Sequence, residues 1–289
     1  MQRRHFLQLT ALGSAALLQT GCDTKVKHDL KMAEQGTEDE VLMYDELSGG
    51  GHTPKDHLFS PKGSQSLPDR FATGREWELV QSVEARLRRV MDWVGFGNFN
   101  IIGFDAVLRF ASAVDRIGTF TPEELTFIEE LFGRDAKEYG FFGDRVVSRL
   151  SETIDEKAVY KVPRSGHFLF RGESERVYDQ ICRDIGESII LTSGVRSIPK
   201  QLHLFLAKTV DTGGNYSEAS RSLAPAGYSY HGIGDFDVGK VGFGARNFTQ
   251  DFAQTREFEK LMKLGYVAIR YPAGNPYGVY FEPWHIEVV

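Results

Sequence analysis

The 289-residue sequence is poor in cysteine and in clustered positive charge. Its only two cysteines, Cys22 and Cys182, exclude a framework of several disulfides, so packing of apolar side chains has to stabilise the fold. Cys182 lies in an apolar stretch and is interpreted as a small buried hydrophobic residue. The formal net charge is −6 and no basic stripe is present, which argues against nucleic acid as a partner.

The first 22 residues are interpreted as an export signal, which places the protein in the periplasm or cell envelope. Arg3 and Arg4 precede an apolar run, 9–18, that is too short to span a bilayer and is typical of a signal-peptide core. The arginine pair resembles a twin-arginine signal, and an ordinary secretory signal is the alternative. Cys22 follows a glycine, as at a lipoprotein cleavage site. Either Cys22 carries a lipid anchor, or cleavage nearby releases a soluble protein.

Two further segments precede the C-terminal domain. Residues 23–74 lose hydrophobic periodicity and are expected to form a flexible linker. Residues 75–157 have apolar side chains at steps of three and four, which predicts a small helical domain with a loop at 95–100. Thr121 and Glu124 are placed to form a capping box at the start of one helix. Substrate positioning and partner binding are both open as roles of this domain.

Residues 158–289 mix helical segments with short apolar runs of strand length. The run 188–192 predicts a strand that delivers the following residues onto a loop. Strands at 267–271 and from 279 onward are expected to bracket a turn rich in proline and glycine. The prediction is an α+β domain with a small antiparallel sheet and flanking helices.

Two segments of this domain combine histidines with carboxylates. The first holds His231 with Asp235 and Asp237, and the second holds Glu282 and His285. Two histidines and one aspartate are ligands that zinc accepts, and a catalytic zinc keeps a fourth position for water. A glutamate beside such a site is the usual base for that water. We therefore expect a zinc peptidase site.

Both segments have to bend if they are to share one metal. An extended chain from His231 to Asp237 would span roughly 20 Å, and the glycines between them permit a turn. Glu282 and His285 are three positions apart, so they would face opposite sides of a regular strand. Pro283 lies between them and favours a local break that turns both side chains to one side.

These segments resemble the zinc D-alanyl-D-alanine carboxypeptidases of the VanY type, over about the last 130 residues. Three ordered blocks carry the resemblance: Thr192-Ser193-Gly194-Val195-Arg196-Ser197 with Gln201, Ser229-x-His231-x-x-Gly234 running to an aspartate, and Glu282-x-Trp284-His285. The family has seven residues from the histidine to the aspartate. Here Asp237 is six from His231, so Asp235 is a rival ligand. Asp237 is preferred because the residues after it continue as in the family.

The resemblance implies a role for each of these residues. Zn²⁺ would be held by His231, Asp237 and His285, and Glu282 would act as the base. Arg196 would stabilise the developing oxyanion or hold a substrate carboxylate.

The remaining polar residues either have lesser expected roles in the site or are left out of it. Ser229 and Gln201 are candidates for holding the substrate peptide. His167 and His203 lie outside the motifs and are interpreted as structural. Arg270 is interpreted as the end of a strand and is left out of the site.

Export together with the resemblance implies the peptidoglycan stem peptide as substrate. The expected reaction is removal of the terminal D-Ala from D-Ala-D-Ala. A peptidoglycan endopeptidase is one alternative, and a non-catalytic cell-wall-binding lipoprotein is another. The only expected membrane contact is a lipid anchor at Cys22, and the sequence does not indicate an oligomeric state.

Overall fold

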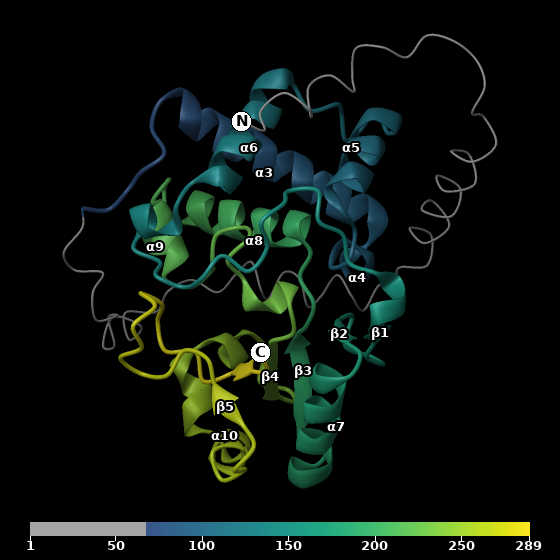
Figure 1. The fold of residues 1–289 in the computed structure, drawn as a ribbon, viewed down its shortest axis with the longest axis vertical. Coiled ribbons are helices and arrows are strands. Elements are labelled where there is room, and N and C mark those ends of the chain that lie inside the picture. The colour runs from purple at the N-terminus through teal and green to yellow at the C-terminus, as the bar shows by residue number, and fades with distance from the viewer. Residues whose placement is uncertain (1–67) are drawn as a thin grey trace.

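The computed structural model describes residues 68–289 (Figure 1). The expected signal peptide, the lipidation site Cys22 and most of the expected linker lie outside the described residues. Between residues 68 and 289, no helix combines the length and the apolar character that crossing a membrane requires.

The first part of the described chain is helical, as the periodicity predicts. Its elements are α3 (Arg75–Val94), α4 (Phe96–Phe99), α5 (Phe104–Ala113), α6 (Pro122–Gly133), and the 3-10 turns η4 (Ala136–Tyr139) and η5 (Glu156–Ala158). The capping box is confirmed, because the Glu124 amide donates to Thr121 Oγ1 at 3.1 Å and Glu124 Oε2 accepts from the Thr121 amide at 2.8 Å. The expected loop at 95–100 is wrong in part, because α4 forms one helical turn there.

The second part alternates strands and helices. Its elements are β1 (Val159–Lys161), β2 (Phe168–Phe170), α7 (Glu173–Ile185), β3 (Ile189–Ser193), α8 (Ile198–Asp211), α9 (Tyr216–Ser220), η6 (Tyr230–Gly232), β4 (Phe236–Lys240), η7 (Gly244–Phe248), η8 (Gln250–Gln254), α10 (Arg256–Leu261), β5 (Ala268–Ile269) and β6 (His285–Glu287). Strands β1 and β2 form an antiparallel hairpin. The main sheet is antiparallel with the order β3-β4-β6-β5, which confirms the predicted α+β class.

The register of the main sheet decides which side chains meet. Asp237 on β4 pairs with Ser193 on β3 on one side and with His285 on β6 on the other. A shift of one residue would turn every side chain of a strand to the opposite face. The register therefore brings two of the predicted site residues to adjacent positions.

Strands β5 and β6 are shorter than expected from the sequence. The chain between them turns away from the sheet, and the Tyr280 amide donates to the carbonyl of Arg221, outside the sheet, at 2.8 Å. Pro272, Pro276 and Pro283 have no amide hydrogen to give to a sheet ladder. Strand β6 consequently begins at His285.

Helix α8 lies between the helical part and the sheet (Figure 1). It packs along α3, and the core around α3 includes Leu202 and Phe205 of α8, both fully buried. A second core lies among α7, the sheet and α10, around Phe236 and Phe252, with the half-buried Cys182 at its side. The domain boundary placed between residues 157 and 158 stays a prediction.

Candidate active site

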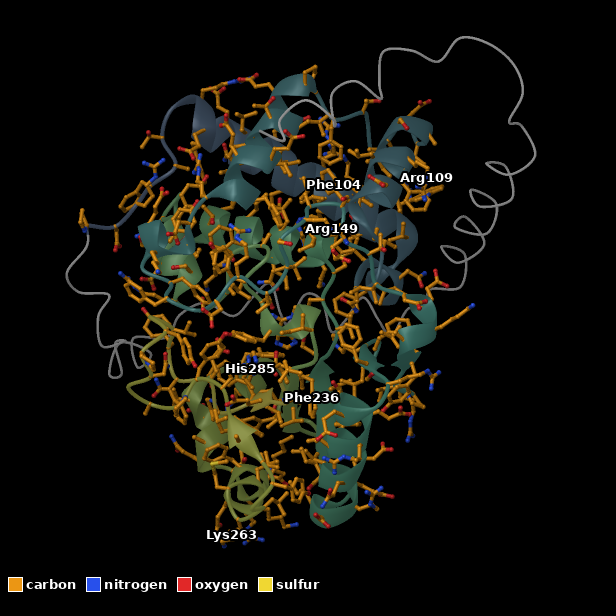
Figure 2. All side chains as sticks on the ribbon, viewed as in Figure 1. Phe104, Arg109, Arg149, Phe236, Lys263 and His285 are labelled. Carbon is orange, nitrogen blue, oxygen red and sulfur yellow. The ribbon has the colours of Figure 1, made fainter. Side chains whose placement is uncertain are left out.

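Three side chains converge where β4 and β6 pair. His231 comes from η6, Asp237 from β4 and His285 from the first position of β6. One ligand atom of each lies within 4.8 Å of the other two, and all three side chains are buried. Figure 2 shows His285 and Phe236 near the end of the sheet that faces the helical part.

The hydrogen bonds of His231 and Asp237 leave one atom of each facing the centre of this group. His231 Nδ1 lies 2.8 Å from the Gly194 carbonyl oxygen, so Nδ1 carries the hydrogen and Nε2 keeps its lone pair. Asp237 Oδ2 accepts from the Arg196 guanidinium at 2.8 Å. His231 Nε2 and Asp237 Oδ1 are buried, lie 3.3 Å apart and have no hydrogen-bond partner among residues 68–289. Buried polar atoms of this kind are usually satisfied, which marks the place for a cation.

His285 is the third member of this group, and one of its ring nitrogens also faces the centre. Its Nε2 lies 3.1 Å from Asp235 Oδ2, and its Nδ1 lies 3.5 Å from Asp237 Oδ1. Ligands on a tetrahedral zinc with bonds near 2 Å are about 3.3 Å apart. Two imidazole nitrogens and one carboxylate oxygen at these separations fit the zinc that the sequence predicts.

Burial and neighbouring charges set the ionisation of these groups. Burial, together with the Arg196 guanidinium, lowers the pKa of His231 to about 4, which keeps it neutral as a ligand must be. Burial alone would raise the pKa of Asp237, but the positive charge of the Arg196 guanidinium opposes it, and the pKa falls to about 2. Burial raises the pKa of Glu282 despite its hydrogen bond with His285. A raised pKa brings a carboxylate closer to the range that suits proton transfer near neutral pH.

Both predicted bends are confirmed. The Tyr230 carbonyl accepts the amides of Ile233 and Gly234, each at 3.0 Å, which curls the chain between His231 and β4. Pro283 lies in a turn that the His285 amide closes on the Glu282 carbonyl at 3.2 Å. The turn brings Glu282 Oε2 to 3.2 Å from His285 Nδ1, beside the three converging atoms.

The structure separates the two rival aspartates. Asp237 belongs to the converging group, whereas Asp235 lies behind His285. Asp235 accepts hydrogen bonds from Arg270 Nε at 2.8 Å and from Arg270 Nη2 at 3.1 Å. The Val288 amide also donates to Asp235 Oδ1 at 2.8 Å. Asp235 therefore orients His285 so that Nδ1 faces the metal position, a common arrangement for metal-binding histidines. The sequence analysis did not predict this contact. The signal that could have indicated it is the second aspartate of the segment, because a buried aspartate needs a cation beside it.

The remaining predicted residues line two neighbouring cavities, and Arg196 and Ser229 line both. Arg196, Ser229 and Glu282 line a cavity of about 180 Å³ together with the three converging side chains. Gln201 is not among its lining residues, and its amide nitrogen donates to the Ala224 carbonyl at 2.6 Å. Gln201 instead lines a smaller neighbouring cavity of about 30 Å³.

Gly194 permits a close approach that supports His231. A Cβ atom on residue 194 would lie 2.0 Å from the Phe168 carbonyl oxygen, which also accepts the Val195 amide at 2.7 Å. We expect Gly194→Ala to lower the free energy of unfolding by about 1–3 kcal/mol through this clash, and to weaken zinc binding by moving the carbonyl that holds His231. Denaturant titration and zinc competition measure the two effects. Gly133→Ala is the control, because a Cβ there meets no atom of residues 68–289 within 4 Å. An equal loss in both variants would contradict the predicted clash.

A comparison of the sequence with known families assigns this part of the chain. Residues 176–289 match the profile described as VanY: D-alanyl-D-alanine carboxypeptidase. These residues belong to the VanY family. The matched range contains all three converging side chains and Glu282. The VanY domain starts within α7, so β1, β2 and the helical part lie outside the matched residues.

Solved structures give further, weaker likenesses to this chain. The LD-carboxypeptidase LdcB is 22% identical with a TM-score of 0.37, over 42% of this chain and 59% of that chain. VanYB in complex with D-Ala-D-Ala is 23% identical with a TM-score of 0.36, over 45% of this chain and 76% of that one. The D,D-dipeptidase VanXYg is 24% identical with a TM-score of 0.35, over 42% and 51%. No curated protein matches the chain. Because the TM-scores are low, the assignment rests on the sequence match.

Proposed function

We propose that the chain is a zinc-dependent peptidase that acts on peptidoglycan stem peptides as a D-alanyl-D-alanine carboxypeptidase. The observation that carries the proposal is the convergence of His231, Asp237 and His285, with one ligand atom of each within 4.8 Å of the other two. The two unpartnered buried atoms among them support metal binding. The family match over residues 176–289 supports the reaction and the class of substrate.

A zinc ion held by His231, Asp237 and His285 would supply a Lewis acid and a water of lowered pKa. Glu282 Oε2, which faces the same point, accepts a proton from the attacking water and returns it to the leaving amine. Arg196 donates from Nε to Ser193 at 3.0 Å and from Nη2 to Asp237, which fixes the guanidinium at the cavity wall. There its charge stabilises the oxyanion that develops on the scissile carbonyl.

The proposed site of action is the periplasm or cell envelope. Residues 1–22 would act as the export signal. Cys22 would carry the lipid anchor in a mature protein that keeps this residue. This part of the proposal rests on the sequence alone, because these residues lie outside the described range.

Cleavage of a defined peptide tests the proposal. Purified, zinc-loaded protein is mixed with a muramyl-type pentapeptide that ends in D-Ala-D-Ala, and mass spectrometry follows the products. We expect loss of one alanine, abolished by a chelator and restored by zinc. An internal cut would assign the chain to the endopeptidases. No cleavage of this peptide or of crosslinked stem peptides would contradict the proposal and favour a wall-binding protein.

A further inference from the structure

The segment 228–231 carries one of the three converging side chains and alternates between two sides of the chain. Ser229 and His231 line the larger cavity, whereas Tyr228 and Tyr230 are buried and line neither of the two cavities. Ser229 has extended backbone angles, φ −80° and ψ 122°, so the side chains before and after it face the opposite way. The direction in which His231 points therefore depends on what holds the two tyrosines.

Arg145, in the helical part of the chain, holds the first tyrosine. Its guanidinium carbon lies 4.4 Å from the centre of the Tyr228 ring, and its Nη2 donates to the Tyr228 hydroxyl at 3.2 Å. The same nitrogen donates to the Arg134 carbonyl at 2.9 Å, and the Tyr228 hydroxyl also accepts the Ala136 amide at 3.2 Å. A guanidinium that stacks on a ring and donates in a fixed fork makes a directional contact, which fixes where Tyr228 lies.

The backbone next to Arg145 fixes the start of the same segment. The amides of Val146 and Val147 both donate to the Gly227 carbonyl, at 2.9 and 3.0 Å. A Cβ atom on residue 227 would lie 2.8 Å from the Val147 carbonyl oxygen and 3.0 Å from Arg145 Nη1. This close approach leaves the segment little room to shift against residues 145–147.

Arg270, at the end of strand β5, holds the second tyrosine. Its guanidinium carbon lies 4.0 Å from the centre of the Tyr230 ring, and its side chain is 6% exposed. The same guanidinium donates through Nε and Nη2 to Asp235, which orients His285. The sequence analysis leaves Arg270 out of the site, whereas the structure places it against the supports of two converging histidines, His231 and His285.

We propose that the helical part of the chain positions a metal ligand: Arg145, acting through Tyr228, directs His231 toward the metal position. Arg270 acts in the same way through Tyr230. This inference rests on the proposed function, which supplies the metal. Neither arginine is among the residues that line the two cavities, so both act through the tyrosines and are positioning residues.

The inference gives the helical part a role that the VanY domain does not supply. Arg145 and its partners Arg134 and Ala136 all precede the matched residues 176–289. Arg145 also lies over the ring of Phe132 on α6, at 5.2 Å from its centre, which connects a helix of the first part to the metal site. The alternative is an arginine that only joins the two parts of the chain and contributes to stability alone.

The zinc affinity of the folded protein separates positioning from stability. A competing chelator dye measures this affinity for the full-length protein, in buffer in which each variant is folded. We expect Arg145→Met to weaken zinc binding by roughly 10-fold, because methionine fills part of the space but neither stacks as a cation nor donates. Arg145→Lys keeps the charge and should recover part of the affinity. The visible spectrum of bound Co²⁺, which reports the ligand geometry, should change in Arg145→Met.

A second set of variants tests whether the arginines act through the tyrosines. Tyr228→Leu should weaken zinc binding about as much as Arg145→Met does, and the double variant should lose no more than either single variant. Tyr230→Leu removes the second ring and leaves the pair of Arg270 with Asp235 in place. This variant should also weaken zinc binding, by roughly 10-fold.

Arg86→Met is the matched control for Arg145→Met. Arg86 of α3 is also half-buried, lies over the ring of Phe120 at 5.2 Å from its centre, and donates to the Gly118 carbonyl at 2.7 Å. Its loss should lower the melting temperature and leave the zinc affinity unchanged. If Arg145→Met does not fold, Arg145→Lys and Tyr228→Leu decide the question.

Three outcomes would overturn the positioning role: unchanged zinc affinity in the variants of Arg145 and Tyr228, an equal loss of affinity in Arg86→Met, or losses that multiply in the double variant. The proposed function can fail separately. A protein whose zinc affinity depends on Arg145 but that cleaves no peptide would contradict the peptidase and keep the positioning role. Cleavage with a zinc affinity independent of Arg145 would do the reverse.

Discussion

Replacing Glu282 with glutamine is expected to lower kcat for the D-Ala-D-Ala peptide by about 10²–10⁴-fold while zinc stays bound. The amide matches the carboxylate in size but cannot take a proton from water. Glu282 is buried and its Oε2 lies 3.2 Å from His285 Nδ1, which places a proton acceptor beside the metal ligands. The zinc ligands themselves are unchanged in this variant.

Steady-state cleavage and zinc content are measured together for this variant. Glu259→Gln serves as the control, because Glu259 is exposed and pairs with Lys263 at 2.6 Å, at the far end of the molecule in Figure 2. Full activity in Glu282→Gln would remove Glu282 as the base. Loss of zinc would show instead that Glu282 helps to hold the metal.

Asp235→Ala is expected to have the largest effect on stability. The side chain of Asp235 is 0% exposed and that of Arg270 is 6% exposed, so the variant removes the buried member of this ion pair. The buried guanidinium keeps only the 40% exposed Glu287 as a carboxylate partner among the described residues, at 3.1 Å. Removing one member of such a pair costs about 3–5 kcal/mol of unfolding free energy. His285 also loses the acceptor that fixes its Nε2 hydrogen, which should weaken zinc binding by about 10–100-fold.

Denaturant unfolding of the chelated protein isolates the effect of the ion pair from that of zinc. A competing chelator dye measures the zinc affinity. Asp251→Ala is the control, because it removes the partner of Arg246 in an exposed ion pair. The side chains are 63% exposed for the arginine and 38% exposed for the aspartate. This variant should lose less than about 1 kcal/mol of unfolding free energy. Equal losses in both variants, or an unchanged zinc affinity in Asp235→Ala, would contradict the positioning role.

Local chemistry made several features predictable from the sequence. The capping box at Thr121 depends on residues three apart, so neighbours in sequence suffice to specify it. The turn at Pro283 follows from the missing amide hydrogen of proline. The short helix α4 escaped prediction because its residues Phe96 and Phe99 are buried by packing against other segments, which outweighs the turn-forming tendency of the glycines around them.

The sequence by itself determined the chemistry of the site: two histidines, an aspartate and a glutamate in segments that have to bend. The tertiary structure alone decided which aspartate faces the metal position, because Asp237 and His285 become neighbours through a strand register that local sequence does not encode. It also decided that Arg270 neutralises Asp235 and that Arg196 donates to Asp237. These contacts join segments far apart in the chain, and they form because buried charges and polar atoms need partners that only the complete fold brings close.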